Sequence, residues 1–267
     1  MTIHGEHGAG WSLYRCGYAE IADLLGSAGI HVDALIVDAP YSEKTHKGHD
    51  AGAVQANRME QGRRSISYAA WGPNEIGAFV RTLAPVVSGW WGTLTDSFLV
   101  TSWFDALASA GLYTFAPIPC VESGATVRMV GDGPPNWTTH LVTGGPESAE
   151  ADATADLVVA RPKGPPWSRW AVRVDREKRE ARPLPGYYLG RREIKPVVGG
   201  KPLWLMKEIV RDYSAPGATI LDPCAGGGTT LLAAISLGRS ALGCEPDPET
   251  FAKAVERLRA AEKEIVR

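Results

Sequence analysis

The fold of this chain is decided by residues 218–245, which read ATILDPCAGGGTTLLAAISLGRSALGCE. An apolar run ends at Asp222, and three consecutive glycines, Gly226, Gly227 and Gly228, follow it. Glycine lets a backbone turn sharply and approach a ligand closely, which side chains would prevent. The pattern predicts a buried strand that leads through a tight turn into a helix.

The remainder of that stretch predicts a second strand. Residues 229–237 have the apolar spacing of a helix, and Gly238 is expected to end it. Residues 241–244 then form a short apolar run, with Glu245 at its carboxyl end. Ligands of open α/β sheets bind at the carboxyl ends of strands, where an acid at the second strand commonly holds ribose hydroxyls. We therefore expect a ribose-containing ligand at this turn.

A glycine-rich turn alone is a weak signal, because some such turns are only tight corners between strand and helix. A dinucleotide site requires the pattern GxGxxG, and a phosphate-binding P-loop requires Gly-Lys-Ser/Thr after four spacer residues. The turn has neither pattern. The two common phosphate-binding classes are therefore disfavoured.

Residues 222–230, DPCAGGGTT, instead resemble the cofactor turn of the DNA amino-methyltransferases. The resemblance extends over residues 201–258, where a Lys-Pro pair opens one helix and an Arg-Leu pair ends the last one. It implies S-adenosyl-L-methionine as cofactor, a molecule with an amino-acid end, a ribose and an adenine. The cofactor-binding residues that it implies in this half are Lys201, Asp222, Cys224, Gly226, Gly228, Thr229, Thr230 and Glu245.

A second motif, Asp38-Ala39-Pro40-Tyr41, ends an earlier buried strand predicted over residues 32–37. It resembles the Asp-Pro-Pro-Tyr motif of the same family, with Ala39 in place of the first proline. The resemblance implies that these four residues are catalytic. A carboxylate and a main-chain carbonyl can accept hydrogen bonds from the two N–H groups of a base amine. The lone pair of the amine nitrogen then points at the methyl donor. Pro40 stiffens the turn, and Tyr41 offers a face on which an extruded base can stack.

Residues 12–38 predict a strand, an amphipathic helix and the buried strand that ends at Asp38. They resemble the opening of the family, whose first strand is followed by Gly-Asp. This chain has Cys16 and Gly17 there, so a carboxylate expected near the adenine is missing. The resemblance implies Cys16 and Gly17 as further cofactor contacts.

The predicted fold class is α/β, a Rossmann-like methyltransferase fold with a mostly parallel seven-stranded sheet and helices on both faces. The catalytic motif precedes the cofactor motif, which is the circularly permuted order of the β-class enzymes. Three regions follow. We expect the catalytic half in residues 1–143, with a mobile loop over residues 42–72. A small target-recognition insert then spans residues 144–200, and the cofactor-binding half spans residues 201–267.

Net charge is −2, but the charges are unevenly distributed. Residues 161–201 hold twelve Lys/Arg and four acids, a local charge of +8, whereas the remainder carries −10. One basic segment on an acidic body favours a localised contact with a polyanion, although a solvated surface insert is the alternative. We expect double-stranded DNA as the partner. The candidate DNA-binding residues, from this segment and from the loop after Tyr41, are Lys44, His46, Lys47, Arg63, Arg64, Arg169, Arg173 and Arg191.

Other classes are disfavoured. No apolar run reaches the ~18 residues of a membrane span, and the N-terminus lacks the regions of a signal peptide, so we expect a cytoplasmic protein. The four cysteines have no CxxC spacing, and no set of metal ligands is evident. Pro119-Cys120 matches the nucleophile of C5-cytosine methyltransferases, but Cys120 lies in an apolar strand without a nearby cation. A structural cysteine is the preferred interpretation.

The sequence thus predicts an S-adenosylmethionine-dependent DNA methyltransferase acting on the N6 amine of a flipped-out adenine, as in restriction-modification. The Asp that heads the catalytic motif favours adenine over the N4 amine of cytosine, which stays an alternative. Ala39 and the missing acid near Gly17 prompt a third hypothesis, a catalytically inactive DNA- or cofactor-binding protein. A homodimer is a further candidate assembly.

Overall fold

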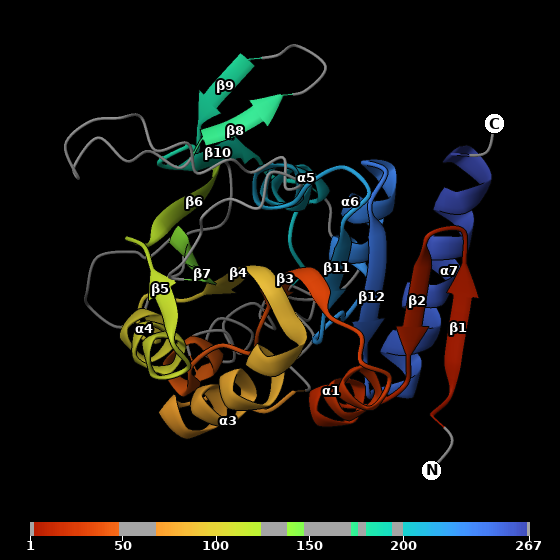
Figure 1. Ribbon diagram of the computed structural model, residues 1–267, viewed down its shortest axis with the longest axis horizontal. Helices are drawn as coiled ribbons and strands as arrows, with labels where there is room; N and C mark the ends of the chain where they lie inside the picture. Colours follow the sequence, from red (N-terminus) through yellow and green to blue (C-terminus); the bar gives the residue numbers. More distant parts are fainter. Residues whose placement is uncertain are drawn as a thin grey trace, which may run out of the picture.

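The computed structural model describes residues 3–47, 68–123, 138–146, 172–175, 180–193 and 200–265 (Figure 1). Strands and helices alternate along much of the chain. In order they are β1 (Gly5–Gly8), β2 (Trp11–Tyr14), α1 (Tyr18–Ser27), β3 (Val32–Asp38), α3 (Pro73–Leu83), η2 (Ala84–Val86), β4 (Val87–Thr95), α4 (Val100–Ser109), β5 (Leu112–Thr114), β6 (Ile118–Ser123), β7 (Thr138–Pro146), β8 (Val172–Asp175), β9 (Glu180–Pro183), β10 (Tyr188–Arg191), α5 (Leu203–Tyr213), β11 (Thr219–Asp222), α6 (Thr229–Ser236), β12 (Ser240–Cys244) and α7 (Pro248–Ile265).

Ten of these strands form one sheet, in the order β1-β2-β12-β11-β3-β4-β7-β6-β10, with β5 paired to β7. The five strands from β2 to β4 are parallel to one another, whereas β1 and β7 run antiparallel to their neighbours. The α/β class is confirmed, but the predicted strand number of seven is wrong. Three short strands, β1, β5 and β10, extend the sheet, because each adds main-chain hydrogen bonds to a strand already present.

Helices cover both faces of the sheet, as predicted, and each face has its own core. On one face α5, α6 and α7 pack on the sheet through side chains such as Leu205, Leu231 and Leu258. On the other face α1, α3 and α4 contribute Ile21, Phe79 and Trp103, among others. Figure 1 shows the two groups of helices on opposite sides of the central strands. The sheet edge between these layers is where the parallel strands present their carboxyl ends.

Two regions depart from regular strand or helix. Residues 112–123 contain two strands, β5 and β6, which residues 115–117 separate. Helix α3 ends at Leu83, and the chain continues as the 3₁₀ turn η2, which contains Pro85. A proline inside a helix removes a donor and clashes with the preceding turn.

No helix within the described ranges has the length and apolar character needed to cross a membrane. All four cysteines are free thiols, and Cys16, Cys120 and Cys244 are buried.

Candidate active site

The catalytic and cofactor motifs meet at one edge of the sheet. Strands β3 and β11 pair in parallel, with Leu35 opposite Leu221. The carboxyl ends of both strands therefore lie at the same edge of the sheet. Asp38 ends β3, Asp222 ends β11, and Glu245 directly follows the neighbouring strand β12. The charges of Asp38 and Glu245 both contribute to raising the pKa of Asp222. Residues far apart in the sequence thus form a single acidic cluster.

The carboxylate of Asp38 is held from two sides. Its Oδ1 atom accepts a hydrogen bond from the Tyr41 hydroxyl at 3.0 Å, and its Oδ2 atom pairs with the Lys201 ammonium at 2.7 Å. The same ammonium lies 4.7 Å from the centre of the Tyr41 ring. The Lys201 side chain is 7% exposed and that of Asp38 is 23% exposed. Lys201, implied by the resemblance as a cofactor contact, is therefore placed against the catalytic motif.

A fourth carboxylate, Asp96, fixes the chain immediately after Tyr41. It follows β4, is 6% exposed, and its Oδ2 atom accepts hydrogen bonds from the Ser42 N–H at 2.9 Å and the Ser42 hydroxyl at 2.6 Å. The Thr45 hydroxyl donates to the same atom at 2.5 Å. Asp96 was not among the predicted site residues. The available signal was its position after a buried strand, the same position that Asp38 has.

The far end of the segment 42–72 also returns to the catalytic motif. The Trp71 N–H donates to the Tyr41 carbonyl at 3.0 Å. The Trp71 ring packs against Phe79, with ring centres 5.0 Å apart, and against Tyr18 at 6.2 Å. Both described ends of this segment are therefore anchored beside Asp38. Residues 48–67, which contain Arg63 and Arg64, lie outside the described residues.

The glycine turn has the backbone geometry that only glycine adopts readily. Gly226 and Gly228 have φ angles of +50° and +74°. A Cβ atom on Gly228 would lie 3.4 Å from Ala254, whereas one on Gly226 would meet nothing closer than 4.0 Å. The Gly226 N–H donates to Glu245 Oε2 at 3.0 Å. The open side of the turn is thus at Gly226, next to Glu245.

Burial changes the acid strength of two residues at this turn. Asp222 is 2% exposed, and burial raises its pKa to about 7, although the Thr230 hydroxyl and the Cys224 N–H oppose that rise. Burial also raises the pKa of Glu245, whose Oε1 atom accepts from the Asp247 N–H at 2.9 Å. A buried acid of raised pKa is stabilised in its charged form by a nearby cation. The cluster is therefore suited to a ligand that carries positive charge.

Arg257 on α7 contacts the glycine turn through hydrogen bonds. It was not among the predicted site residues. Its Nη1 atom donates to the Gly227 carbonyl and lies 3.4 Å from the Thr229 hydroxyl. Burial lowers the pKa of this guanidinium. Only the Arg-Leu pair expected to end the last helix indicated this residue in the sequence, and α7 in fact continues past it to Ile265.

Cys16 and Gly17 lie at the end of β2, next to β12. The Cys16 and Cys244 thiols are hydrogen-bonded to each other, and this contact lowers the pKa of Cys16. The Gly17 N–H donates to Glu20 Oε2 at 2.7 Å, which fixes the start of α1. Burial raises the pKa of Cys120 to about 12, although the charge of Lys201 opposes that rise, so the expectation that no cation lies near Cys120 is wrong. A thiolate nucleophile at Cys120 is disfavoured, in agreement with its interpretation as a structural cysteine.

The predicted DNA contacts are only partly described. Lys44 lies 4.8 Å from the centre of the Phe98 ring, His46 lies edge-on to Tyr68, and Lys47 pairs with Glu43 at 2.8 Å. Arg191 is exposed on β10. Arg169 and the Arg173 side chain lie outside the described residues.

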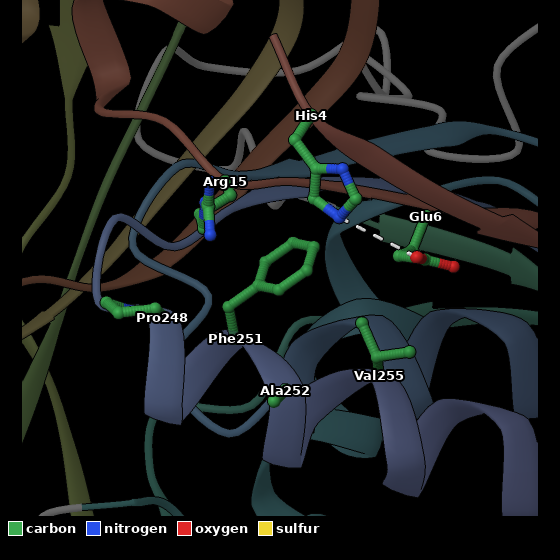
Figure 2. A pocket seen from close by; sticks show the side chains of 7 residues that line it. All are labelled: His4, Glu6, Arg15, Pro248, Phe251, Ala252 and Val255. Carbon is green, nitrogen blue, oxygen red and sulfur yellow. Dashed lines mark ion pairs between the residues drawn. The ribbon is translucent and has the colours of Figure 1, made fainter.

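Figure 2 shows a pocket of about 330 Å³ between the start of α7 and the β1–β2 hairpin. The Phe251 ring of α7 forms its floor, and His4, Glu6 and Arg15 approach from the β1–β2 hairpin. None of the predicted site residues lines it. Across the described ranges, no group of three or more His, Cys, Asp or Glu could hold a metal ion.

One segment of the chain is similar in sequence to a known family, and most of the chain is similar in fold to solved structures. Residues 167–256 match the family model described as DNA methylase. No curated protein sequence matches the chain. The structure of the M1.HpyAVI–SAM complex superposes with a TM-score of 0.64 at 20% identity, covering 93% of this chain and 98% of that one. M1.HpyAVI itself gives 0.59 at 20% identity, with the same coverage of both chains. The cytosine-N4-specific PvuII DNA methyltransferase gives 0.58 at 11% identity, covering 96% and 93%.

The resemblance predicted from the two motifs is confirmed by these comparisons, in sequence over the cofactor half and in fold over the whole sheet. The chain has the fold of a DNA methyltransferase, with the sequence pattern of the DNA methylase family in residues 167–256.

Proposed function

We propose that this protein is a DNA amino-methyltransferase that uses S-adenosyl-L-methionine. The observation that carries the proposal is the meeting of two motifs at one sheet edge. Asp38, held by Lys201 and Tyr41, ends the strand next to the one that leads into the glycine turn. The match to the DNA methylase family supports the reaction class, and M1.HpyAVI was crystallised with SAM.

The residues of the turn fit this cofactor. Glu245 stands where ribose hydroxyls are bound in open α/β sheets. The buried acid Asp222 suits a molecule that carries a sulfonium and an ammonium group, since a cation favours its charged form. The open side of Gly226 allows close approach to the backbone. When bound, the cofactor supplies a methyl group on sulfur, so that transfer forms an N–C bond from the amine lone pair, leaves the C–S electron pair on sulfur and releases one amine proton.

The chain's own residues orient the amine. The Asp38 carboxylate and the carbonyl of residue 39 accept hydrogen bonds from the two N–H groups of the target amine. This arrangement favours a pyramidal nitrogen with an available lone pair. Ala39 supplies that carbonyl as well as proline would, because the acceptor is main chain. The Tyr41 ring offers a stacking surface for a base removed from the duplex. Holding the reacting atoms ~3–3.5 Å apart supplies the rest of the rate enhancement.

We assign the N6 amine of adenine as the target because an Asp heads the catalytic motif. The N4 amine of cytosine is the second candidate, and the likeness to the cytosine-N4-specific PvuII enzyme favours it. A catalytically inactive DNA- or cofactor-binding protein is the third, prompted by Ala39 and by Cys16-Gly17. The +8 charge of residues 161–201 supports double-stranded DNA as substrate. A cytoplasmic, restriction-modification role and a homodimer belong to the same proposal.

The substitution Asp38→Ala tests the proposed function. Single-turnover methyl transfer should fall by at least about tenfold, because a charge-assisted contact contributes at least ~1.5 kcal/mol. Cofactor affinity by calorimetry should stay within about twofold of the wild type, which is ~0.4 kcal/mol. Asp105→Ala, which removes an exposed acid of α4, is the matched control and should change neither quantity. Retention by the Asp38 variant of more than about a tenth of the rate, equivalent to ~1.4 kcal/mol, contradicts the assignment.

A further inference from the structure

Lys201 is the one cation that the structure places against the catalytic carboxylate within the described residues. Its ammonium is 2.7 Å from Asp38 Oδ2 and 4.7 Å from the centre of the Tyr41 ring. The side chain is 7% exposed, so the charge is largely removed from water. A buried cation is costly unless a counter-ion and further contacts compensate for its lost hydration. Asp38 and the Tyr41 ring provide that compensation.

The position of Lys201 is set by packing rather than by the cofactor turn. It lies two residues before α5, whose side chains Leu205 and Ile209 pack in the same core as Ala34 and Ile36 of β3. The helix start is therefore fixed above the end of β3. From there the lysine side chain reaches Asp38, which is 163 positions away in the sequence.

We propose that Lys201 is a positioning residue for methyl transfer and acts through Asp38 rather than by binding the cofactor. This inference rests on the proposed function and concerns the same site. Lys201 on Oδ2 and the Tyr41 hydroxyl on Oδ1 fix the plane of the carboxylate. Each oxygen of an ionised carboxylate has two lone-pair sites, so both retain capacity for the target amine.

Charge also argues against a cofactor role. Of the charged groups of the methyl donor, the sulfonium and the ammonium would repel a lysine, and only the carboxylate would attract one. Lys201 is already paired with Asp38, whereas the acids Asp222 and Glu245 lie at the glycine turn. Removing the lysine charge should therefore slow the reaction without weakening cofactor binding.

The first experiment compares Lys201→Met, Lys201→Arg and Lys207→Met. Lys207 lies on α5 itself and is the matched control for removal of a lysine charge. Single-turnover transfer at saturating cofactor should fall at least about tenfold in Lys201→Met, as expected when a charge-assisted hydrogen bond is removed. Cofactor affinity should be unchanged or tighter. Lys201→Arg should recover most of the missing rate, because it restores the ion pair, and Lys207→Met should resemble the wild type.

A second experiment needs no bound cofactor. Unfolding free energies of the ligand-free protein are measured for Lys201→Met, Asp38→Asn and the double variant. Residues that act through one another give non-additive changes. The double variant should therefore lose less stability than the sum of the two single losses. Additive losses would overturn the coupling of Lys201 to Asp38.

Three outcomes are decisive. Loss of cofactor affinity in Lys201→Met, with a normal rate at saturation, would make Lys201 a cofactor ligand and overturn the inference. An unchanged rate and affinity would overturn it as well. If Lys201→Met does not fold, Lys201→Gln, which removes the charge but keeps a polar side chain, decides by the same two measurements. If the wild type fails to methylate DNA, the proposed function itself is contradicted. If Lys201→Met transfers methyl groups at the wild-type rate, only this inference is contradicted.

Discussion

Two carboxylates at the ends of neighbouring strands have opposite surroundings. Asp38, at the end of β3, pairs with the Lys201 ammonium and accepts a hydrogen bond from the Tyr41 hydroxyl. Asp222, at the end of β11, is fully buried and accepts from the Cys224 N–H at 3.1 Å. No ion pair reaches Asp222 from the described part of the chain, and burial raises its pKa to about 7. The protein therefore compensates the charge of one acid and leaves that of the other uncompensated.

This difference separates the two tasks of the site. An acid that is already paired and oriented can accept hydrogen bonds from a target amine without rearrangement. An acid left without a cation gains most from a ligand that brings one. Each of the following changes tests one side of the comparison, and their expected effects on cofactor binding decrease in the order given.

The largest effect is expected from Gly226→Val, on the cofactor side. The φ angle of +50° strains any side chain, and a Cβ atom there projects into open space where the ligand is expected. We expect cofactor affinity by calorimetry to fall by at least about tenfold, or ~1.4 kcal/mol. The strain should also lower the unfolding free energy by ~1–2 kcal/mol.

Gly238→Val is the control for strain, because Gly238 has a φ angle of +70° and nothing within 4 Å of its added Cβ atom. It should lose similar stability and keep wild-type cofactor affinity. Equal affinities in the wild type and both variants would place the cofactor elsewhere. Equal losses of affinity in both variants would indicate that strain alone is responsible.

The second prediction tests the uncompensated acid through Asp222→Asn. The folded-state pKa of Asp222, about 7, is above the unfolded value of ~3.9, so the folded state binds the proton more tightly. Its contribution to stability is complete below about pH 4 and is lost as the pH rises through about 7. The unfolding free energy of the wild type should therefore decline relative to that of Asp222→Asn between about pH 4 and pH 7.

Urea unfolding at a series of pH values measures this difference. Parallel pH profiles for the two proteins would show that Asp222 titrates as an ordinary exposed acid. Asp105→Asn, at an exposed position of α4, should leave the wild-type profile unchanged.

Substitutions of arginine in the basic segment, residues 161–201, are expected to have the smallest effect on the site formed by Asp38 and Asp222. Replacing Arg169, Arg173 and Arg191 together with Ala should weaken DNA binding and flatten the slope of log affinity against log salt, by up to ~0.9 for each phosphate that is no longer neutralised. Cofactor affinity should hardly change. A control triple, Arg81, Lys207 and Lys253 to Ala, makes the same charge change elsewhere. An unchanged salt slope in the first triple would move DNA binding to the loop after Tyr41, and a joint loss of DNA and cofactor binding would indicate a structural role.

The sequence was sufficient for features that depend on local pattern. A buried apolar run that ends in Asp predicted both β3 and β11, and the glycines predicted the turn between β11 and α6. Their adjacency was implied by the resemblance rather than by the pattern. The role proposed for Asp38 was likewise implied by the resemblance of residues 38–41 to the Asp-Pro-Pro-Tyr motif.

Other features depend on contacts between distant residues and could not be predicted. The pairing of Lys201 with Asp38 and the support of Gly227 by Arg257 arise only when helices dock on the sheet. The strand β1, with the sequence GEHG, has no apolar alternation, and it exists because β2 offers an edge for pairing. The raised pKa of Asp222 likewise reflects burial, which residue type alone does not reveal.

The central claim is that the edge shared by Asp38 and the glycine turn methylates a base amine. The most direct measurement incubates unmethylated duplex DNA with the wild-type protein and cofactor that carries a deuterated methyl group. The DNA is then digested to nucleosides and analysed by mass spectrometry. We predict labelled N6-methyladenine, with none formed by Asp38→Ala. Labelled N4-methylcytosine would change the target but keep the site, whereas labelled C5-methylcytosine, or no labelled nucleoside on DNA of varied sequence, would contradict the account.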